Sequence, residues 1–263
     1  MINNNKKLKP PIKCPGGKRF LVSKVNELWE TSNAKRLVEP FSGGLSIALG
    51  ILPKSAYLND SNPHVINFYQ WIKEGLEISI TMKNKKSFYY QQREKFNNLI
   101  NESKINSKEC AELFYYLNRT GYNGLVRFNK SGLYNVPFGR YKKINYKRTF
   151  DEYPENMQSW EFSHGDFSKL KIKTTDLLYV DPPYDVEFRS YSIDRFNWED
   201  QVRLIEWLSN KNCPVIISNQ ATKRIKELYK ENGYKLDYIL APRMISCNGD
   251  RTPAKEVIAT KNF

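Results

Sequence analysis

The chain has 263 residues, of which 40% are hydrophobic and 14% aromatic, so it can form one large domain, or one domain with a smaller insertion. Its 42 lysines and arginines outnumber 28 acids and give a formal charge of +14, which favours a polyanionic partner such as nucleic acid. The apolar runs are too short for a membrane span, and residues 1–13 lack the apolar core of a signal peptide.

The four cysteines are widely scattered, and His64 and His164 are the only histidines. Because no Cys-x-x-C pair occurs, the sequence predicts neither a disulfide framework nor a zinc site. We therefore expect no metal, and a zinc-dependent deaminase or nuclease is disfavoured.

The first predicted element is a helix with Leu21, Val25 and Leu28 on one face, and it follows the segment Lys13-Cys14-Pro15-Gly16-Gly17-Lys18. Two glycines before a helix let the backbone approach a ligand, and the helix amino end favours anionic groups, so Lys18 could meet a carboxylate. An ordinary turn is the alternative.

The next segment predicts a strand through Leu37-Val38-Glu39, a tight turn at Phe41-Ser42-Gly43-Gly44, and a helix from Ile47. This pattern is typical of the opening of a nucleotide-binding βα unit. A second strand over residues 56–58 ends at Asn59-Asp60. An acid in that position commonly binds ribose hydroxyls, whereas the alternative is that Asp60 caps the helix predicted over residues 63–73.

The pattern changes between residues 64 and 145. Helices are predicted near residues 64–74, 87–103 and 108–118, followed by a hairpin that turns at Asn129-Lys130-Ser131-Gly132. Basic and aromatic residues alternate with glycine and asparagine along residues 116–143. Such residues can bind bases and phosphates, but a surface hairpin whose tyrosines cover a small core fits the composition equally well.

Four apolar residues, Leu177-Leu178-Tyr179-Val180, run into Asp181-Pro182-Pro183-Tyr184. The run predicts a buried parallel strand that the prolines end, which places Asp181 at the sheet edge where ligands bind. The turn offers a carboxylate and a stiff carbonyl without a competing proline N–H, which suits an exocyclic amino group. Tyr184 offers a face for a flat ring. A strand-ending turn with a capping acid is the alternative.

The remaining sequence returns to α/β alternation after a polar, aromatic segment, residues 185–197, that we expect to form a lid. Helices are predicted over residues 198–209 and 222–232, with strands over 214–218, 234–240 and 257–260. Ser218-Asn219 ends its strand at the same sheet edge as Asp181 and could line the same pocket. Residues 243–251 predict another loop that contacts a nucleic-acid backbone.

Asp181-Pro182-Pro183-Tyr184 resembles the catalytic motif of the amino-group DNA methyltransferases, which use S-adenosylmethionine. Phe41-Ser42-Gly43-Gly44 resembles their cofactor loop. The span from Asn118-Arg119 to Gly139-Arg140-Tyr141-Lys142 is similar to the recognition hairpin of the Dam-type adenine methyltransferases, which modify GATC. The order of cofactor loop, insertion and catalytic motif resembles the α group of the D12 class.

This resemblance implies a cofactor site. Lys18 and its neighbours would contact the methionine part, with Cys14 standing where close relatives commonly carry an aromatic residue. Asp60 would bind the ribose, Asp166 would accept a hydrogen bond from the cofactor's adenine amino group, and Phe167 would lie beside that ring. For Asp166, a Gly-Asp turn that caps a short helix is the alternative. The implied cofactor residues are Cys14, Lys18, Phe41, Gly43, Asp60, Asp166, Phe167 and Asp181.

The resemblance also implies a set of DNA contacts, which divide into base contacts, a residue pair that fills the duplex, and backbone contacts. Arg127 would bind guanine, Leu125 and Pro137 would contact the outer bases, Tyr122 with Asn123 would fill the gap left by a flipped adenine, and Lys13 would contact DNA near the site edge. From their chemistry, Arg119, Arg140, Lys142 and Lys143 are assigned to phosphates.

We therefore expect a Rossmann-like methyltransferase sheet, seven-stranded and mostly parallel, formed by residues 1–63 and 146–263, with a target-recognition insertion at 64–145. The expected activity is methyl transfer from S-adenosylmethionine to the N6 amino group of adenine in double-stranded DNA, within GATC, by base flipping. Asp181, Pro182 and Tyr184 would be catalytic. We expect a monomer in the cytoplasm of a bacterial or phage-infected cell, associated with the nucleoid through DNA, with no membrane partner. A non-catalytic DNA-binding protein and an amino methyltransferase acting on RNA or protein glutamine are the alternatives.

Overall fold

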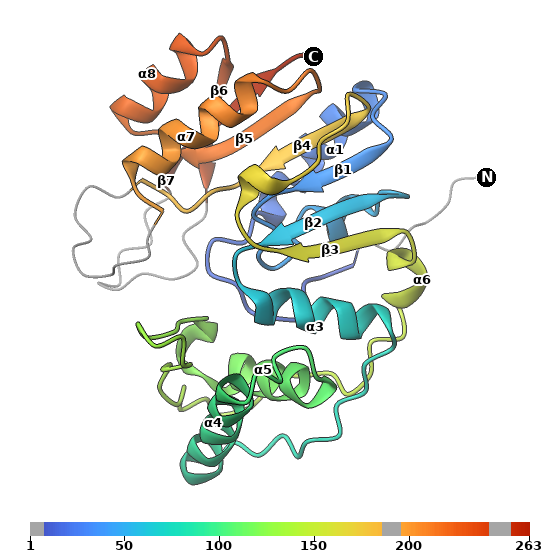
Figure 1. The fold of residues 1–263 in the computed structure, drawn as a ribbon, viewed down its shortest axis with the longest axis vertical. Coiled ribbons are helices and arrows are strands. Elements are labelled where there is room, and N and C mark those ends of the chain that lie inside the picture. The colour runs from blue at the N-terminus through green and yellow to red at the C-terminus, as the bar shows by residue number, and fades with distance from the viewer. Residues whose placement is uncertain (1–7, 186–195, 242–253) are drawn as a thin grey trace.

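Figure 1 shows the computed structural model, which describes residues 8–185, 196–241 and 254–263. Most of the predicted lid and the predicted loop over residues 243–251 lie outside these ranges. The core is a seven-stranded sheet in the order β3-β2-β1-β4-β5-β7-β6. The strands are β1 (Arg36–Glu39), β2 (Ala56–Asp60), β3 (Trp160–His164), β4 (Asp176–Val180), β5 (Val215–Gln220), β6 (Lys235–Ala241) and β7 (Ala254–Lys261).

Strands β1 to β5 pair in parallel, and β7 runs antiparallel between β5 and β6. The prediction of a seven-stranded, mostly parallel sheet is therefore confirmed. The order changes direction between β1 and β4, which lie side by side although the whole insertion separates them in the sequence. In sheets of this kind a ligand binds at the carboxyl ends of the strands beside such a crossover point.

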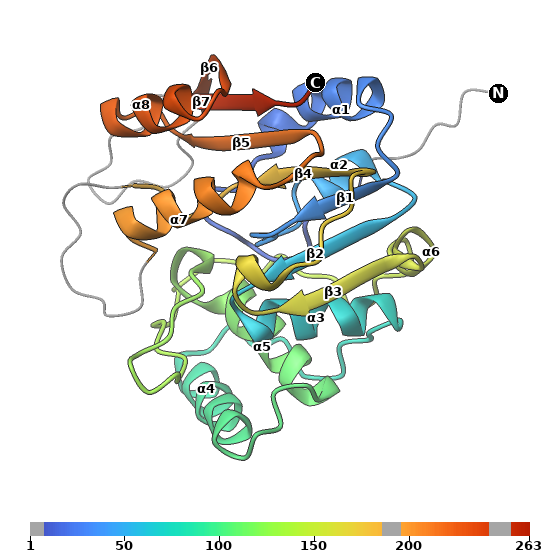
Figure 2. The ribbon, with the colours of Figure 1, turned by 45° about the horizontal axis from the view of Figure 1, so that its top comes forward.

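The central strand β4 is buried on both faces, which explains its uninterrupted apolar sequence. Leu177 and Tyr179 pack on the side of α1 (Val22–Thr31), α2 (Ala48–Ile51) and α3 (Pro63–Lys73). Leu178 and Val180 pack on the opposite side, against α7 (Trp198–Ser209) and α8 (Lys223–Glu231). Figure 2 shows the helical layers around the sheet. Among the described residues, no helix is long and apolar enough to cross a bilayer.

The inserted segment adds α4 (Lys86–Asn101) and α5 (Lys108–Thr120), which lie beyond α3 on the β3 side of the sheet in both views. These helices occur nearly where the sequence predicted them, and the hairpin turn is confirmed because the Asn129 amide donates to the Leu133 carbonyl at 2.9 Å. Isolated bridges join Phe128 to Tyr134 and Gly121 to Phe138. Asn97 of α4 anchors the hairpin by bonding both the amide and the carbonyl of Tyr134.

Strand β3, the short helix α6 (Pro154–Met157) and the 3-10 helices η1 (Arg19–Leu21) and η2 (Tyr122–Gly124) were not predicted from the sequence. The 3-10 helix η3 (Phe167–Lys169) was predicted only as the alternative role of Asp166. Strand β3 lies at the sheet edge, so only Trp160 is buried and the next four residues are mostly polar or half exposed. Its sequence therefore lacks the apolar run that marks a central strand. Its position matters because it brings Asp166 to the same edge as the other strand ends.

Candidate active site

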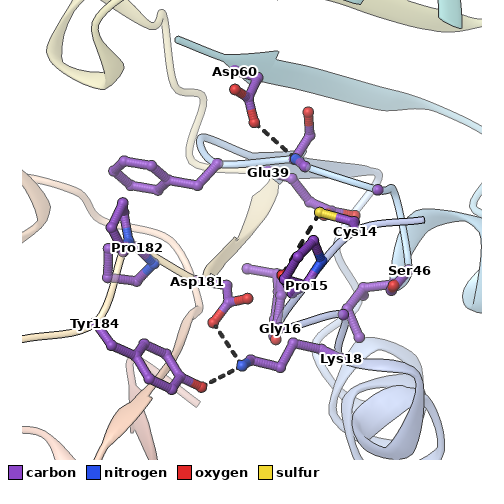
Figure 3. Close-up of a pocket in the computed structure, with 18 of the residues that line it drawn as sticks. Cys14, Pro15, Gly16, Lys18, Glu39, Ser46, Asp60, Asp181, Pro182 and Tyr184 are labelled. Carbon is purple, nitrogen blue, oxygen red and sulfur yellow. Dashed lines mark hydrogen bonds and ion pairs between the residues drawn. The ribbon is translucent and has the colours of Figure 1, made fainter. Parts of the chain in front are cut away.

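A cavity of about 310 Å³ opens at the carboxyl ends of β1, β2 and β4 (Figure 3). Its walls come from the segment before η1, the glycine turn after β1, the end of β2 and the proline turn after β4. The predicted residues that line it are Cys14, Lys18, Phe41, Gly43, Asp60, Asp181, Pro182 and Tyr184. The structure thus brings together predicted site residues from four separate segments of the sequence.

Asp60 fixes the glycine turn to the end of β2. Its Oδ2 accepts from the Gly43 amide at 2.8 Å, and its Oδ1 accepts from the Asn62 amide at 2.9 Å. Gly43 has a φ of +46°, a conformation that glycine adopts without strain. Asn62, rather than Asp60, caps α3, since its side chain accepts from the amide of His64. Burial raises the pKa of Asp60. Its ribose contact remains a prediction.

Asp181 stands at the end of β4 beside the end of β5. Ser218 donates to Asp181 Oδ1 at 2.8 Å, and the Tyr179 and Ser218 hydroxyls are 2.9 Å apart. The expectation that Ser218 lies at this edge is therefore confirmed, but neither Ser218 nor Asn219 lines the cavity. Burial raises the pKa of Asp181 to about 6, although Lys18 and Ser218 act in the opposite direction. The carboxylate is accordingly ionised at neutral pH.

The proline turn is held from behind by α7 and α8. The Gln201 side chain, which is buried, donates to the Pro183 carbonyl at 2.9 Å. Arg224 forms a two-point ion pair with Asp185, just past the turn. Within the described ranges, no donor reaches the Pro182 carbonyl. The turn therefore offers the cavity an ionised carboxylate and a carbonyl that can accept.

Lys18 projects into the site rather than away from it (Figure 3). Its ammonium lies 3.5 Å from Asp181 Oδ1 and 3.5 Å from Glu256 Oε1, and it bonds to the Tyr184 hydroxyl. The same nitrogen is 4.3 Å from the Tyr184 ring centroid. Burial, together with the charges of Asp181 and Glu256, raises the pKa of Tyr184, so the phenol stays protonated. A contact between Lys18 and the cofactor remains a prediction.

Glu39, which the sequence analysis did not select, also lines the cavity. Its Oε1 accepts from the Ala48 amide at 2.8 Å, and burial raises its pKa to about 8, so it is mostly protonated at neutral pH. A signal was present, because Glu39-Pro40 repeats the acid-proline ending of Asp181-Pro182. Across the cavity, burial raises the pKa of the Cys14 thiol to about 11.

Asp166 and Phe167 stand beside the cavity but do not line it. Asp166 caps η3 through the Ser168 amide, so the capping alternative is confirmed. Both of its oxygens also accept from Arg203 at 2.9 Å, and Arg203 holds the pKa of Asp166 well below its ordinary value. Phe167 packs against Phe41 with ring centroids 5.4 Å apart. Their predicted contacts with the cofactor's adenine remain predictions.

The inserted segment is attached to the cavity wall through Lys13, which precedes the cavity-lining residue Cys14. Asn118 of α5, which is fully buried, accepts from the Lys13 amide and donates to its carbonyl, both at 2.7 Å. Gly124 packs so closely that a Cβ there would lie 2.2 Å from the Lys13 Cβ. The loop that contains Tyr122 and Asn123 is therefore fixed to the residue that precedes Cys14, although neither Tyr122 nor Asn123 lines the cavity.

The predicted DNA contacts differ in accessibility. Arg127, Pro137 and Arg140 are exposed, Tyr122 is 50% exposed, and Asn123 and Leu125 are half buried. Arg119 is less available, because its guanidinium donates to the carbonyls of Pro11 and Asn145. Its phosphate contact, like the other DNA contacts, remains a prediction. No group of three or more His, Cys, Asp or Glu side chains in the described chain could hold a metal ion.

Residues 15–241 match the model of the D12 class N6 adenine-specific DNA methyltransferases. The chain is 33% identical to the retron Ec67 DNA adenine methylase of Escherichia coli over 94% of this chain and 90% of that protein. It is 33% identical to the DNA adenine methylase of E. coli K12, covering 97% and 95% of the two chains. The type II methyltransferase M.MjaIII of Methanocaldococcus jannaschii is 29% identical, with 93% and 95% covered.

Proposed function

The chain belongs to the D12 class of N6 adenine-specific DNA methyltransferases, and we propose that it modifies adenine within GATC in double-stranded DNA after flipping the base. Its methyl donor is S-adenosylmethionine, as the sequence predicted. The proposal rests on the turn at residues 181–184. There an ionised Asp181 stands beside the Pro182 carbonyl, which accepts no hydrogen bond from the described residues. That pair matches the two hydrogens of an exocyclic amino group.

The residues of the cavity fit this donor. The glycine turn allows close approach of backbone at Gly43, Asp60 would bind the ribose, and Lys18 and Cys14 would lie along the methionine part. Asp181 supplies a negative charge in the wall of the cavity. When bound, S-adenosylmethionine supplies a methyl group activated by a sulfonium charge.

The protein's part in the transfer is to orient the amine and to stabilise charge. Asp181 and the Pro182 carbonyl accept the two amino hydrogens, which directs the nitrogen lone pair toward the methyl group. The same acceptors stabilise positive charge as it develops on nitrogen, and they are already in place before the reaction. Tyr184 stacks on the adenine ring. A paired adenine cannot present its amino group to this cavity, so the base must leave the duplex.

Recognition is assigned to the segment 64–145. Its exposed Arg127 suits a bidentate contact with guanine, and the exposed ring of Tyr122 suits the gap left by the flipped base. The formal charge of +14 supports binding to the phosphate backbone. One chain carries both the cavity and the hairpin, which supports action as a monomer.

The test compares the wild-type chain with Asp181→Ala in single-turnover methylation of a duplex that contains one GATC site. We expect the variant to lose about 10³-fold or more in rate, because it loses an oriented charge acceptor, while duplex affinity largely survives. Asp237→Ala removes an exposed acid on β6 and serves as the matched control, with a normal rate expected. Near-normal turnover of Asp181→Ala would refute the assigned chemistry.

The recognition sequence is tested separately by mapping methylated adenines in DNA from a host that expresses the wild-type chain. Methylation confined to GATC supports the proposed site. Methylation at a longer sequence, or at sites without GATC, would show that the hairpin has another specificity even if the chemistry is correct.

A further inference from the structure

Lys18 lies between two carboxylates, and only one of them lines the cavity. Its ammonium is 3.5 Å from both Asp181 and Glu256, and the side chains of Lys18 and Glu256 are only 5% and 7% exposed. Asp181 lines the cavity, whereas Glu256 stands behind it on β7. Glu256 also lies beyond residue 241, where the match to the family model ends.

An acid at position 256 is not explained by the packing of β7. In the sheet Glu256 pairs with Gln220 of β5 and Ile239 of β6. Its Oε2 is buried and has no hydrogen-bond partner within the part of the chain that the structure describes. A buried carboxylate with an unpaired oxygen destabilises a fold, so its presence points to a use for its charge.

The formal charges of the cluster formed by Lys18, Asp181 and Glu256 indicate what the charge of Glu256 does. Counted as one ammonium and two carboxylates, Lys18, Asp181 and Glu256 carry a formal charge of −1, whereas Lys18 and Asp181 alone would form a neutral pair. We propose that Glu256 is a positioning residue that balances Lys18, so that Asp181 presents a net negative charge to the cationic methyl donor. The inference rests on the proposed function of the cavity.

The consequence is a preference for substrate over product. S-adenosylmethionine and its product, S-adenosylhomocysteine, differ by the methyl group and its positive charge. A cluster with a charge of −1 stabilises the first ligand more than the second, because electrostatic interactions are strong in a partly dehydrated site. Glu256 therefore favours release of the product after each transfer.

The test measures both affinities by isothermal titration calorimetry on the full chain without DNA. For Glu256→Gln we expect affinity for S-adenosylmethionine to fall about tenfold, and affinity for S-adenosylhomocysteine to change by less than about twofold. Glu256→Asp keeps the charge and should retain most of the wild-type preference. The thermal melting curve of Glu256→Asp shows whether substitutions at residue 256 disturb the fold.

A second pair of variants separates charge from contact. Lys18→Met makes the cluster more negative and should increase the preference for S-adenosylmethionine, and Lys18→Met combined with Glu256→Gln restores the formal charge of −1 and should restore the wild-type ratio. Any contact between Lys18 and the ligands' shared carboxylate cancels in that ratio.

The proposal would be overturned if Glu256→Gln lost affinity equally for both ligands, so that the ratio of the affinities for S-adenosylmethionine and S-adenosylhomocysteine stayed at the wild-type value. A double variant whose ratio follows that of Glu256→Gln would also overturn it. Failure of the wild-type chain to bind either ligand would instead contradict the proposed function itself, so the two failures are distinguishable.

Discussion

At the scale of single residues, the proposed chemistry depends on Asp181, a carboxylate whose charge is set by its neighbours. Burial is the largest influence on Asp181 and raises its pKa to about 6, and the negative charge of Glu256 acts in the same direction. Lys18 and the hydrogen bond from Ser218 lower it. The result is a group that is ionised at neutral pH and protonated in mildly acidic solution.

The pH dependence of the reaction should report this balance. Only the ionised form of Asp181 attracts a cation and leaves both carboxylate oxygens able to accept a hydrogen bond from the amine. We therefore expect kcat/KM for the methyl donor to rise from pH 5 to 7 with an apparent pKa near 6. Initial rates with a saturating short duplex give the profile. In Glu256→Gln the midpoint should lie at lower pH, because a charge that raised the pKa of Asp181 is gone. A flat profile over this range would contradict the assignment.

At the scale of elements, the proline turn is rigid because α7 and β5 hold it through buried amides. Gln201 donates to the Pro183 carbonyl and accepts from Asn219 at 3.2 Å, and Asn219 also donates to Tyr229 of α8 at 2.9 Å. Each of these side chains is buried. A satisfied buried network fixes one geometry, since any shift leaves a polar group unpaired.

Gln201→Leu should therefore slow the transfer while leaving the cofactor site intact. We expect kcat to fall about tenfold because the turn is less well oriented, and stability to fall by about 1–3 kcal/mol because the Pro183 carbonyl loses its donor. Single-turnover rates and thermal melting measure the two effects. Asn67→Leu removes a comparable buried amide, which donates to the Ser107 carbonyl, and should cost stability with a normal rate. Equal rates in both variants would exclude a positioning role for Gln201.

In the hairpin that is proposed to recognise DNA, one residue also orients another. Arg127 Nε donates to Asn135 Oδ1 at 2.7 Å, and Arg127 Nη2 donates to the Asn135 carbonyl at 3.3 Å, across the two arms of the hairpin. The Nη1 end of the guanidinium has no such contact among the described residues. Asn135 thus directs the side chain that is proposed to bind guanine.

Arg127→Ala should relax discrimination at that guanine by about 1–3 kcal/mol, which is roughly fivefold to 150-fold. Asn135→Ala should have a smaller effect at the same base, because the arginine remains but is less well oriented. Methylation rates on a set of singly substituted GATC duplexes measure both. Lys130→Ala, at the exposed hairpin turn, is the control and should weaken binding evenly. An unchanged ranking of sites in Arg127→Ala would contradict the assignment.

At the scale of the whole molecule, the carboxyl ends and the amino ends of the central strands have different roles. The carboxyl ends of the strands form the cavity, whereas the amino ends of β1 and β4 are joined by a buried ion pair. Arg36 donates to both oxygens of Asp176 at 2.9 and 2.8 Å, and Asp176 is fully buried. Stability and chemistry can therefore be altered separately.

Arg36→Met should lower the free energy of unfolding by about 3–5 kcal/mol, because it leaves the Asp176 charge buried and unpaired. The affinity for S-adenosylmethionine at 25 °C should stay close to the wild-type value, since this pair lies at the opposite end of the strands from the cavity. Denaturant unfolding and calorimetry test the two statements. A large loss of affinity in a variant that is still folded would show that the two ends are coupled.

The amino-acid sequence by itself determined the central strand, the proline turn and the glycine turn. These features follow from local rules: an apolar run is buried, proline ends a strand, and an acid before proline stands at the sheet edge. Asp181, Gly43 and Asp60 were found in this way, and the structure places all three on one cavity. Edge strand β3 was missed because a half-exposed strand lacks an apolar run.

Only the tertiary structure decided which distant groups support that cavity. Glu256 and Gln201 lie outside the sequence motifs and no local pattern marks them, because their contacts with Lys18 and the Pro183 carbonyl join segments that are distant in the sequence. Such contacts depend on strand order and on which helix faces which strand. These contacts form because burying a polar group without a hydrogen-bond partner costs free energy. That cost arises only in the folded chain, where the group is removed from water.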